Sequence, residues 1–320
     1  MSFLAKLLAT AIITTAFLPA CDSSERTIER GDVVNLYSNT LTSSDQQLFE
    51  PFEKASGLRV NIIFGMGEEL VKRASARKHD STNADLLLLR GIEHLRTAQE
   101  SNLIDTLFDG SFFTAVPSHL RGEDRQWLGL AYSTLPIAYR ADSLDSLQVR
   151  NYQQLAEERW QGRIFIPQDE EVATALLAAH LAGQGREATK TWWGSLLRNR
   201  TDSLDSLSLL QIAYVKNYQP DEDWRLVFPQ PETYLQVTGL ALCTYAPRPA
   251  YAKSLFTYMF SRAFVKRYCE KYRLYPGRTD VEQPATLVPA AAFQPDTTAQ
   301  DRIAGFTDEA RILARGVFTP

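Results

Sequence analysis

Short apolar stretches that alternate with helical segments are the feature that most constrains how this chain can fold. Residues 33–37, 58–64 and 84–89 are strand-length segments rich in apolar residues. A helix that includes Leu48 and Phe52 and ends at Gly57, and a second helix at residues 68–77, alternate with them. The run at 84–89 includes four consecutive leucines, so this strand must be covered on both faces. Continuously apolar strands that alternate with helices are typical of a mainly parallel α/β sheet.

Further candidate strands and helices continue this pattern toward the end of the chain. We expect strands at residues 126–139, 163–167, 226–229 and 237–245. We expect helices at residues 152–160, 172–182 and 189–197, and a largely helical tail from residue 250 onward. A chain of 320 residues with 44% apolar content can bury one large core or, as we expect at this length, two.

The N-terminal segment has the pattern of a lipoprotein export signal. One basic residue, Lys6, precedes an apolar run at residues 7–17, and small residues stand ahead of Cys21. This run is shorter than the roughly 20 residues that a transmembrane helix needs. We therefore expect residues 1–20 to be a signal peptide, Cys21 to become the lipidated N-terminus and residues 21–30 to form a tether. An ordinary signal peptide that happens to end at a cysteine is the alternative.

The charge balance excludes some classes of partner. The chain has 34 Lys and Arg against 38 Asp and Glu, a formal net charge of −4, and no polybasic stripe. Nucleic acids and anionic membrane surfaces both require clustered Lys and Arg. We therefore expect no nucleic-acid partner, and attachment to a membrane only through the lipid at Cys21.

Two further cysteines, Cys243 and Cys269, would lie in an oxidising compartment after export. Their spacing in the sequence does not establish the geometry that a disulfide requires. We expect two buried free thiols, and a disulfide between them is the alternative.

The sequence has no recognisable motif of an enzyme. It lacks Gly-x-Ser-x-Gly, His-Glu-x-x-His and paired cysteine motifs, and its four histidines have no metal-ligand spacing. The segment 64–68 resembles a phosphate loop but lacks the third glycine and the lysine. We interpret it as a strand-to-helix turn with Glu68 at the helix start. We therefore expect that the protein is not an enzyme.

Several short motifs occur in an order that resembles a known protein family. They are Val34-Asn35-Leu36-Tyr37-Ser38, Phe52-Glu53-Lys54-Ala55-Ser56-Gly57, Asn83-Ala84-Asp85, Trp127-Leu128-Gly129-Leu130, Trp160-Gln161-Gly162-Arg163-Ile164 and Leu274-Tyr275-Pro276. In order and spacing they are similar to periplasmic solute-binding proteins of ABC importers. The resemblance is to the ferric-iron-binding branch, within extracellular solute-binding family 1, and it spans most of the mature chain.

This resemblance implies a two-lobed periplasmic-binding-protein fold of type II, an α/β fold with mainly parallel sheets and a hinge between the lobes. We expect residues 31–100 plus about 235–265 in lobe 1, and residues 101–234 plus about 266–320 in lobe 2. The resemblance also implies a monomer that works with an importer permease and its ATPase. Because Asp22 follows the lipidated cysteine, it implies the periplasmic face of the inner membrane as the location.

The iron ligands that the resemblance implies are only partly present. The family surrounds ferric iron with anionic oxygen atoms, mostly from paired tyrosines. Tyr214 is the one candidate phenolate that matches this pair, and Arg90 stands where one branch places a carboxylate. No histidine or second tyrosine follows Tyr37 and Ser38. Iron(III) is therefore a candidate ligand whose usual coordination would be incomplete here.

The candidate ligand-binding residues combine these matches with polar residues in the same loops. They are Tyr37, Asn39, Thr40, Glu68, Asp169, Glu170, Tyr214 and Tyr218, with Tyr214 also as the candidate metal ligand. For the tyrosines, packing in a core is the alternative, and for the acidic run at 169–171 it is a solvated helix start. We expect a lipoprotein that delivers iron(III), another metal or a small cation to its importer. A ligand-sensing or interaction protein that kept the fold is the alternative.

Overall fold

Two β-sheets, each beside its own hydrophobic core, organise the part of the chain that the computed structural model describes. These residues are 32–145, 148–166, 170–204, 208–217 and 223–318. Within them, the first sheet has six strands in the order β11-β4-β10-β3-β1-β2, and the second has five in the order β7-β6-β8-β5-β9. The predicted α/β fold is confirmed, but the prediction of mainly parallel sheets is wrong, because both sheets mix parallel and antiparallel pairs.

The first sheet combines parallel and antiparallel strands. Its strands are β1 (Val33–Ser38), β2 (Arg59–Phe64), β3 (Leu86–Arg90), β4 (Trp127–Thr134), β10 (Leu235–Leu242) and β11 (Tyr275–Pro276). β1 pairs in parallel with β2 and β3, whereas β10 is antiparallel to β3 and β4. The four leucines of β3 are all fully buried, as the continuous apolar run predicted.

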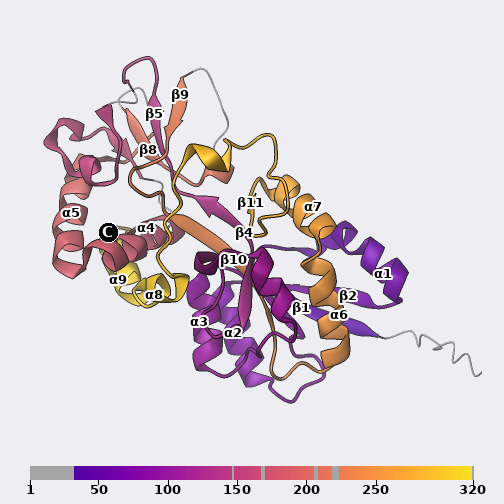
Figure 1. Cartoon of the computed structure of the whole chain (residues 1–320). Helices are drawn as coiled ribbons and strands as arrows, with labels where there is room; N and C mark the ends of the chain where they lie inside the picture. The colour runs from indigo at the N-terminus through magenta and orange to yellow at the C-terminus, as the bar shows by residue number, and fades with distance from the viewer. Residues whose placement is uncertain (1–31, 146–147, 167–169, 205–207, 218–222, 319–320) are drawn as a thin grey trace, which may run out of the picture. The chain divides into compact units, whose positions relative to one another are not determined.

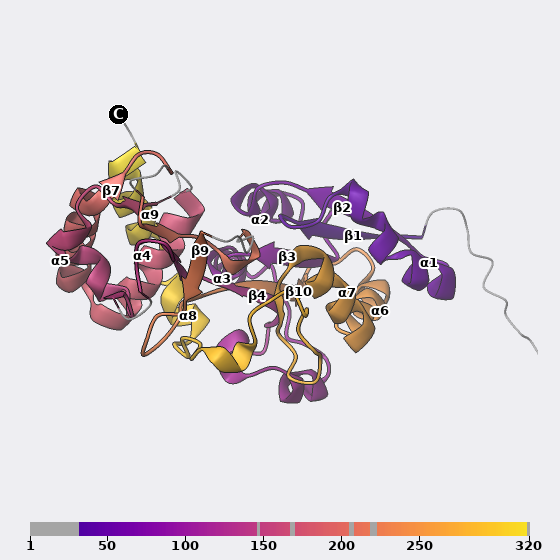
Figure 2. The same cartoon turned by 90° about the horizontal axis from the view of Figure 1, so that it is seen from above.

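Helices lie on both sides of the first sheet. They are α1 (Glu50–Ser56), α2 (Gly67–Ala76), α3 (Ile92–Glu100), α6 (Pro249–Met259) and α7 (Arg262–Tyr272). α2 and α3 lie on one side of the sheet, and α6 and α7 lie on the other (Figures 1 and 2). α1 ends at Gly57, whose φ of 73° is in the left-handed region that favours glycine, so the predicted helix end is confirmed.

The second sheet is shorter, and the C-terminal helices pack against a helix of its core. Its strands are β5 (Ile137–Arg140), β6 (Ile164–Phe165), β7 (Arg200–Thr201), β8 (Leu210–Ile212) and β9 (Trp224–Val227). The helices of this part are α4 (Glu170–Gln184), α5 (Arg186–Asn199), α8 (Gln300–Ala304) and α9 (Thr307–Phe318). α4 contacts α5, α8 and α9, and Figure 1 shows α8 and α9 in yellow beside it. The end of the chain therefore returns to the second core.

Short 3-10 helices fill several connections in the described residues. They are η1 (Ser43–Leu48), η2 (Gly110–Ala115), η3 (Ser118–Leu120), η5 (Gln153–Ala156), η6 (Glu158–Trp160), η7 (Val215–Asn217) and η8 (Ala290–Ala292). Residues 152–160, where a single helix was predicted, thus form two such turns.

The predicted strand at 126–139 is divided between the two sheets. β4 ends at Thr134 in the first sheet, and β5 begins at Ile137 in the second. Pro136 lies between them, and a proline has no N–H to continue a ladder of hydrogen bonds. The chain crosses from one core to the other at this point. It crosses back before β10, which therefore enters the first sheet antiparallel to β3.

These crossings favour lobe boundaries other than those expected at residues 100 and 265. Residues 103–131 and 252–274 contribute to the core of the first sheet, because β4 and β11 pair in that sheet. We propose that the first lobe comprises residues 32–134 and 235–276. The second lobe would then comprise residues 135–234 and the C-terminal helices.

Three predictions about the termini and thiols have different outcomes. The signal peptide, the tether and Cys21 lie outside the described residues and stay predictions. Cys243 and Cys269 are buried free thiols, as expected, and burial raises the pKa of each well above its ordinary value. Among the described helices, we find none with the length and apolar content of a membrane span.

Candidate ligand-binding cleft

A cleft of about 450 Å³ is lined by residues from both cores. The first core contributes Asn39, the segments 64–68 and 90–94 and the start of β10 at 235–237. The second core contributes residues of α4, α8 and α9. A concave site of this size with a few converging polar groups is typical of small-ligand binding. We therefore take it as the candidate site.

One wall of the cleft is the turn between β2 and α2. β2 ends at Phe64 and α2 begins at Gly67, so the predicted strand-to-helix turn is confirmed. A Cβ atom on Gly67 would lie 2.3 Å from the Cδ2 atom of His94, so a side chain there would displace the imidazole. Glu68 lines the cleft, and its pKa is lowered by a hydrogen bond from Lys72, with Nζ 2.7 Å from Oε1. Glu68 is thus already paired at the surface.

The cleft lining includes an ion pair between Arg90 and Glu171. Arg90 is the last residue of β3, and Glu171 lies in the first turn of α4. The Nε and Nη2 atoms of Arg90 donate to Oε1 and Oε2 of Glu171 at 2.9 and 3.1 Å. Gln236 at the start of β10 donates its Nε2–H to the same Oε1. This bidentate arrangement is the strong form of an arginine–carboxylate contact, and it connects the two cores.

Asn39 fixes the backbone of Arg90. Its Oδ1 accepts from the backbone N–H of Arg90 at 2.8 Å, and its Nδ2 donates to the backbone oxygen of Arg90 at 2.9 Å. Gly91 follows with a φ of 92°, a left-handed conformation that favours glycine. Asn39 lines the cleft, but both ends of its amide bind the protein backbone. It therefore acts as a positioning residue.

Two arginines of α9 reach the first turn of α4. The Nε atom of Arg315 lies 2.9 Å from Oε1 of Glu170, and the Nε atom of Arg311 lies 3.9 Å from the same oxygen. Arg311 also pairs with Asp308 at 3.0 Å. The cleft lining thus holds three arginines and four glutamates, and at least two of those glutamates face guanidinium groups.

Three buried polar atoms on the cleft lining have no hydrogen-bond partner among the described residues. They are Oγ1 of Thr174, Oε1 of Gln236 and Nε2 of Gln300. These side chains belong to residues that are only 8%, 6% and 4% exposed. Buried polar groups in proteins almost always have a partner. The cleft therefore presents unsatisfied hydrogen-bonding capacity.

The structure does not place the predicted tyrosines in the cleft. Tyr37 is fully buried and its hydroxyl donates to the backbone oxygen of Thr82 at 3.2 Å. Burial raises the pKa of Tyr37, although the nearby Arg73 lowers it. Tyr214 is 1% exposed in the core of the second sheet, with the Nζ atom of Lys216 5.1 Å from its ring centre. Both tyrosines pack in a hydrophobic core, which was the alternative to a role as ligands.

The other predicted site residues have mixed outcomes. Glu68 and Glu170 line the cleft, as does Asn39. Thr40 does not, because its hydroxyl lies 3.1 Å from the hydroxyls of Ser38 and Tyr268. Asp169 and Tyr218 lie outside the described residues. In the described ranges, no group of three or more His, Cys, Asp and Glu side chains could hold a metal ion.

Sequence reasoning missed the guanidinium groups and the amide that shape the cleft. Arg90 was noted only as a replacement for a carboxylate, and Gln236, Arg311 and Arg315 were not considered. The i, i+4 spacing of Arg311 and Arg315 is a sequence signal that places both on one helix face. Nothing in the sequence links that face to Glu170, which lies more than a hundred residues earlier.

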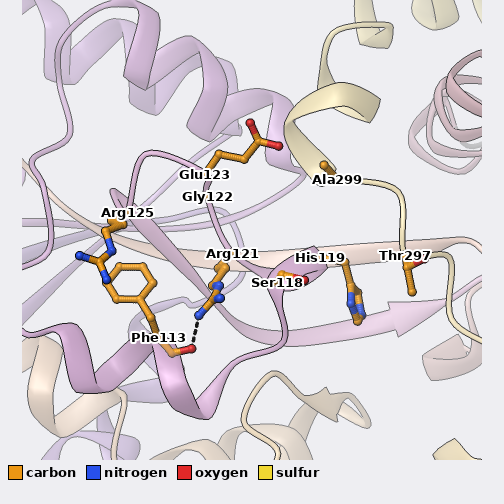
Figure 3. Close-up of a pocket in the computed structure, with 9 residues that line it drawn as sticks. All are labelled: Phe113, Ser118, His119, Arg121, Gly122, Glu123, Arg125, Thr297 and Ala299. Carbon is orange, nitrogen blue, oxygen red and sulfur yellow. Dashed lines mark hydrogen bonds between the residues drawn. The ribbon is translucent and has the colours of Figure 1, made fainter.

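A second cavity of about 420 Å³ lies beside η2 and η3 (Figure 3). The guanidinium carbons of Arg121 and Arg125 lie 5.7 and 5.0 Å from the ring centre of Phe113. Arg121 also donates to the backbone oxygen of Phe113, and burial lowers the pKa of His119. Both arginines are thus engaged by Phe113. The cleft, which is lined by both cores and has unsatisfied polar atoms, is the stronger candidate.

Relatives of the chain are found among curated proteins. No family model matches it. Iron uptake protein A1 from Synechocystis is 24% identical over 298 residues, which cover 84% of this chain and 82% of that protein. Iron uptake protein A2 from the same organism is 26% identical over 167 residues, which cover 52% of this chain and 46% of that protein.

Solved structures have the same fold. IdiA (FutA) from Trichodesmium, described as in complex with iron and citrate ligands, has a TM-score of 0.78 at 23% identity, covering 89% of this chain and 99% of that one. The ferric binding protein from Campylobacter jejuni has a TM-score of 0.76 at 22% identity, with the same coverage of 89% and 99%. At these identities the structures show the fold alone.

The names of these relatives agree with the expectation that the chain is not an enzyme, because they are uptake and binding proteins. The structural matches confirm the two-lobed α/β fold of a periplasmic binding protein. The chain is therefore similar in sequence to iron uptake protein A1 and similar in fold to the ferric-binding proteins.

Proposed function

We propose that the protein carries iron(III) in the cleft and delivers it to the permease of an ABC importer. The observation that supports this most is a cleft lined by both cores in a chain related to proteins named for iron uptake. A ligand that contacts both cores stabilises one arrangement of the two, and a permease can recognise that arrangement. The importer's ATPase would supply the energy for transport.

A bare small cation drawn by the acidic run at the start of α4 has less support as the ligand. A hard cation requires several anionic oxygen atoms. Glu171 is engaged by Arg90, and Glu170 by Arg315, so both carboxylates are compensated by positive charge. No tyrosine belongs to the described cleft lining. Iron(III) that brings its own oxygen ligands fits this lining better than a bare ion.

We propose that a lipid at Cys21 holds the protein at the periplasmic face of the inner membrane, beside its permease. The pattern at residues 6–21 supports the anchor. An anchored protein diffuses along the membrane that contains its permease, so each delivery requires a short search. A monomer is sufficient for this role.

Iron uptake and iron content together test the proposed function. Deleting the gene should lower the uptake of radioactive iron from ferric citrate by iron-starved cells, and the intact gene should restore it. Protein purified without chelators should contain about one iron per chain by mass spectrometry. If uptake is unchanged by the deletion and the purified protein contains no iron, the proposal is wrong.

A further inference from the structure

We infer that the cleft binds its cargo through carboxylate groups of the cargo, and that the Glu171 side chain occupies the place of one such group until cargo binds. This inference rests on the proposed function, because it names the chemical class of ligand for the same cleft. That class is an organic polycarboxylate, either free or as its iron(III) complex.

The geometry around Glu171 is that of a carboxylate-binding site. Two N–H groups of Arg90 and one of Gln236 converge on this one carboxylate. A guanidinium fork matches the two oxygens of a carboxylate and gives directional recognition. All three donors belong to the first core, whereas Glu171 belongs to α4 of the second. The first core thus provides the donors that bind a carboxylate, and the second core provides the carboxylate of Glu171.

The Arg90–Glu171 pair can be exchanged at little cost. The side chains of Arg90 and Glu171 are 29% and 40% exposed, and an ion pair with this access to water contributes little net stability. A displaced Glu171 would still lie in the first turn of α4, where the helix dipole favours a negative charge. A carboxylate of a ligand can therefore replace that of Glu171 at Arg90.

The unsatisfied atoms of the cleft point to a ligand with several oxygen atoms. The Nε2 group of Gln300 is an N–H donor, and the hydroxyl of Thr174 can donate as well. A metal ion cannot accept a hydrogen bond from either group, whereas carboxylate and hydroxyl oxygens of an organic acid can. Arg311 and Arg315 also line the cleft, where they pair with Asp308 and Glu170, and their guanidinium groups attract anionic rather than cationic ligands. The lining therefore suits a polycarboxylate better than a bare metal ion.

The variant Glu171→Gln distinguishes a carboxylate-binding site from a metal site, because the two predict different changes in citrate affinity. It removes the competing negative charge and keeps the shape of the side chain. Citrate should bind this variant about fivefold more tightly than the wild type at pH 7 and low salt, as measured by calorimetry. If Glu171 were instead a metal ligand, the same change would weaken the binding of ferric citrate and leave citrate alone unaffected.

Arg90→Gln and a matched control complete the test. Arg90→Gln should weaken citrate binding at least about tenfold, because it removes both guanidinium donors. Arg262→Gln is the control, because Arg262 forms a similar 2.8 Å pair with Asp280 but does not line the cleft. Melting curves would identify a variant that fails to fold, and the Glu171→Gln result decides the question without Arg90→Gln.

The possible outcomes separate this inference from the proposed function. Weaker or unchanged citrate binding by Glu171→Gln overturns the inference. If the wild-type protein still binds ferric citrate in that case, the proposed function stands. If the wild type binds neither citrate nor ferric citrate, both are wrong.

Discussion

The buried imidazole of His180 should make the stability of the second core depend on pH. His180 is 2% exposed on α4, where its ring stacks on Trp192 with a centroid distance of 4.1 Å and its Nδ1 lies 2.9 Å from Oγ1 of Thr189. Burial lowers the pKa of His180 from 6.5 to about 4. The unfolded chain therefore binds a proton at a higher pH than the folded chain does. The stabilising contribution of the neutral ring is complete above pH 6.5 and is lost as the pH falls toward 4.

The size of this effect follows from the two pKa values. Between pH 7.5 and pH 5, His180 should lower the free energy of unfolding by about 2 kcal/mol. Urea denaturation of the wild type and of His180→Gln at both pH values measures it. The variant should lose about 2 kcal/mol less than the wild type over this range, whatever its stability at pH 7.5. The control is His79→Gln, because His79 is exposed. An equal loss in the wild type and in His180→Gln would refute the reasoning.

Three further predictions concern anchoring, ligand-linked movement and iron chemistry. Cys21→Ser should move the protein from the membrane to the soluble periplasmic fraction or leave it unprocessed; fractionation like the wild type would rule out the lipid anchor. Ferric citrate should reduce the radius of gyration measured by small-angle scattering, because a ligand that contacts both cores draws them together; an unchanged radius with proven binding in the cleft would contradict this mechanism. Ferric citrate should give no strong tyrosinate absorption band, and Tyr214→Phe should change its affinity by less than about twofold, because Tyr214 is buried away from the cleft. A strong visible band that is lost in Tyr214→Phe would show that the buried tyrosine reaches the iron.

Local patterns were sufficient to predict the first half of the first sheet. The apolar runs at 58–64 and 84–89 are β2 and β3, and Gly57 ends α1 as expected. These elements follow one another in sequence and pair with near neighbours, so hydrophobic periodicity and turn residues determine them. The turn at 64–68 was predicted for the same reason.

Elements that depend on distant pairing were predicted less well. The segment 126–139 is mainly apolar, and the sequence pattern does not indicate that its two halves belong to different sheets. β10 is a strand of the expected composition, but its antiparallel direction follows from the path of the chain through the second core. The direction of a strand and its neighbours in a sheet depend on the path of the whole chain, which residue composition does not specify.

In the candidate site too, local sequence patterns identified some lining residues but not the contacts between residues far apart in the chain. Asn39, Glu68 and Glu170 were predicted from their places at the ends of strands or starts of helices, and all three line the cleft. The contact between Arg90 and Glu171 joins residues 81 positions apart, and no local pattern implies it. Tyr37 and Tyr214 were chosen by residue type, and residue type does not separate a ligand from a core side chain.

The Arg90–Glu171 pair also bears on how the importer would distinguish loaded from empty protein. A contact between the two cores favours the same arrangement of the cores that cargo favours. Because both side chains are partly exposed, the pair is worth at most about 1 kcal/mol, which changes the ratio of two conformations about fivefold. Switching a protein from almost entirely one conformation to almost entirely the other requires a factor of about 10,000. The pair alone therefore cannot imitate the loaded state. Cargo must add contacts beyond the one that it takes over from Glu171, and the unsatisfied Thr174 and Gln300 are the groups available to provide them.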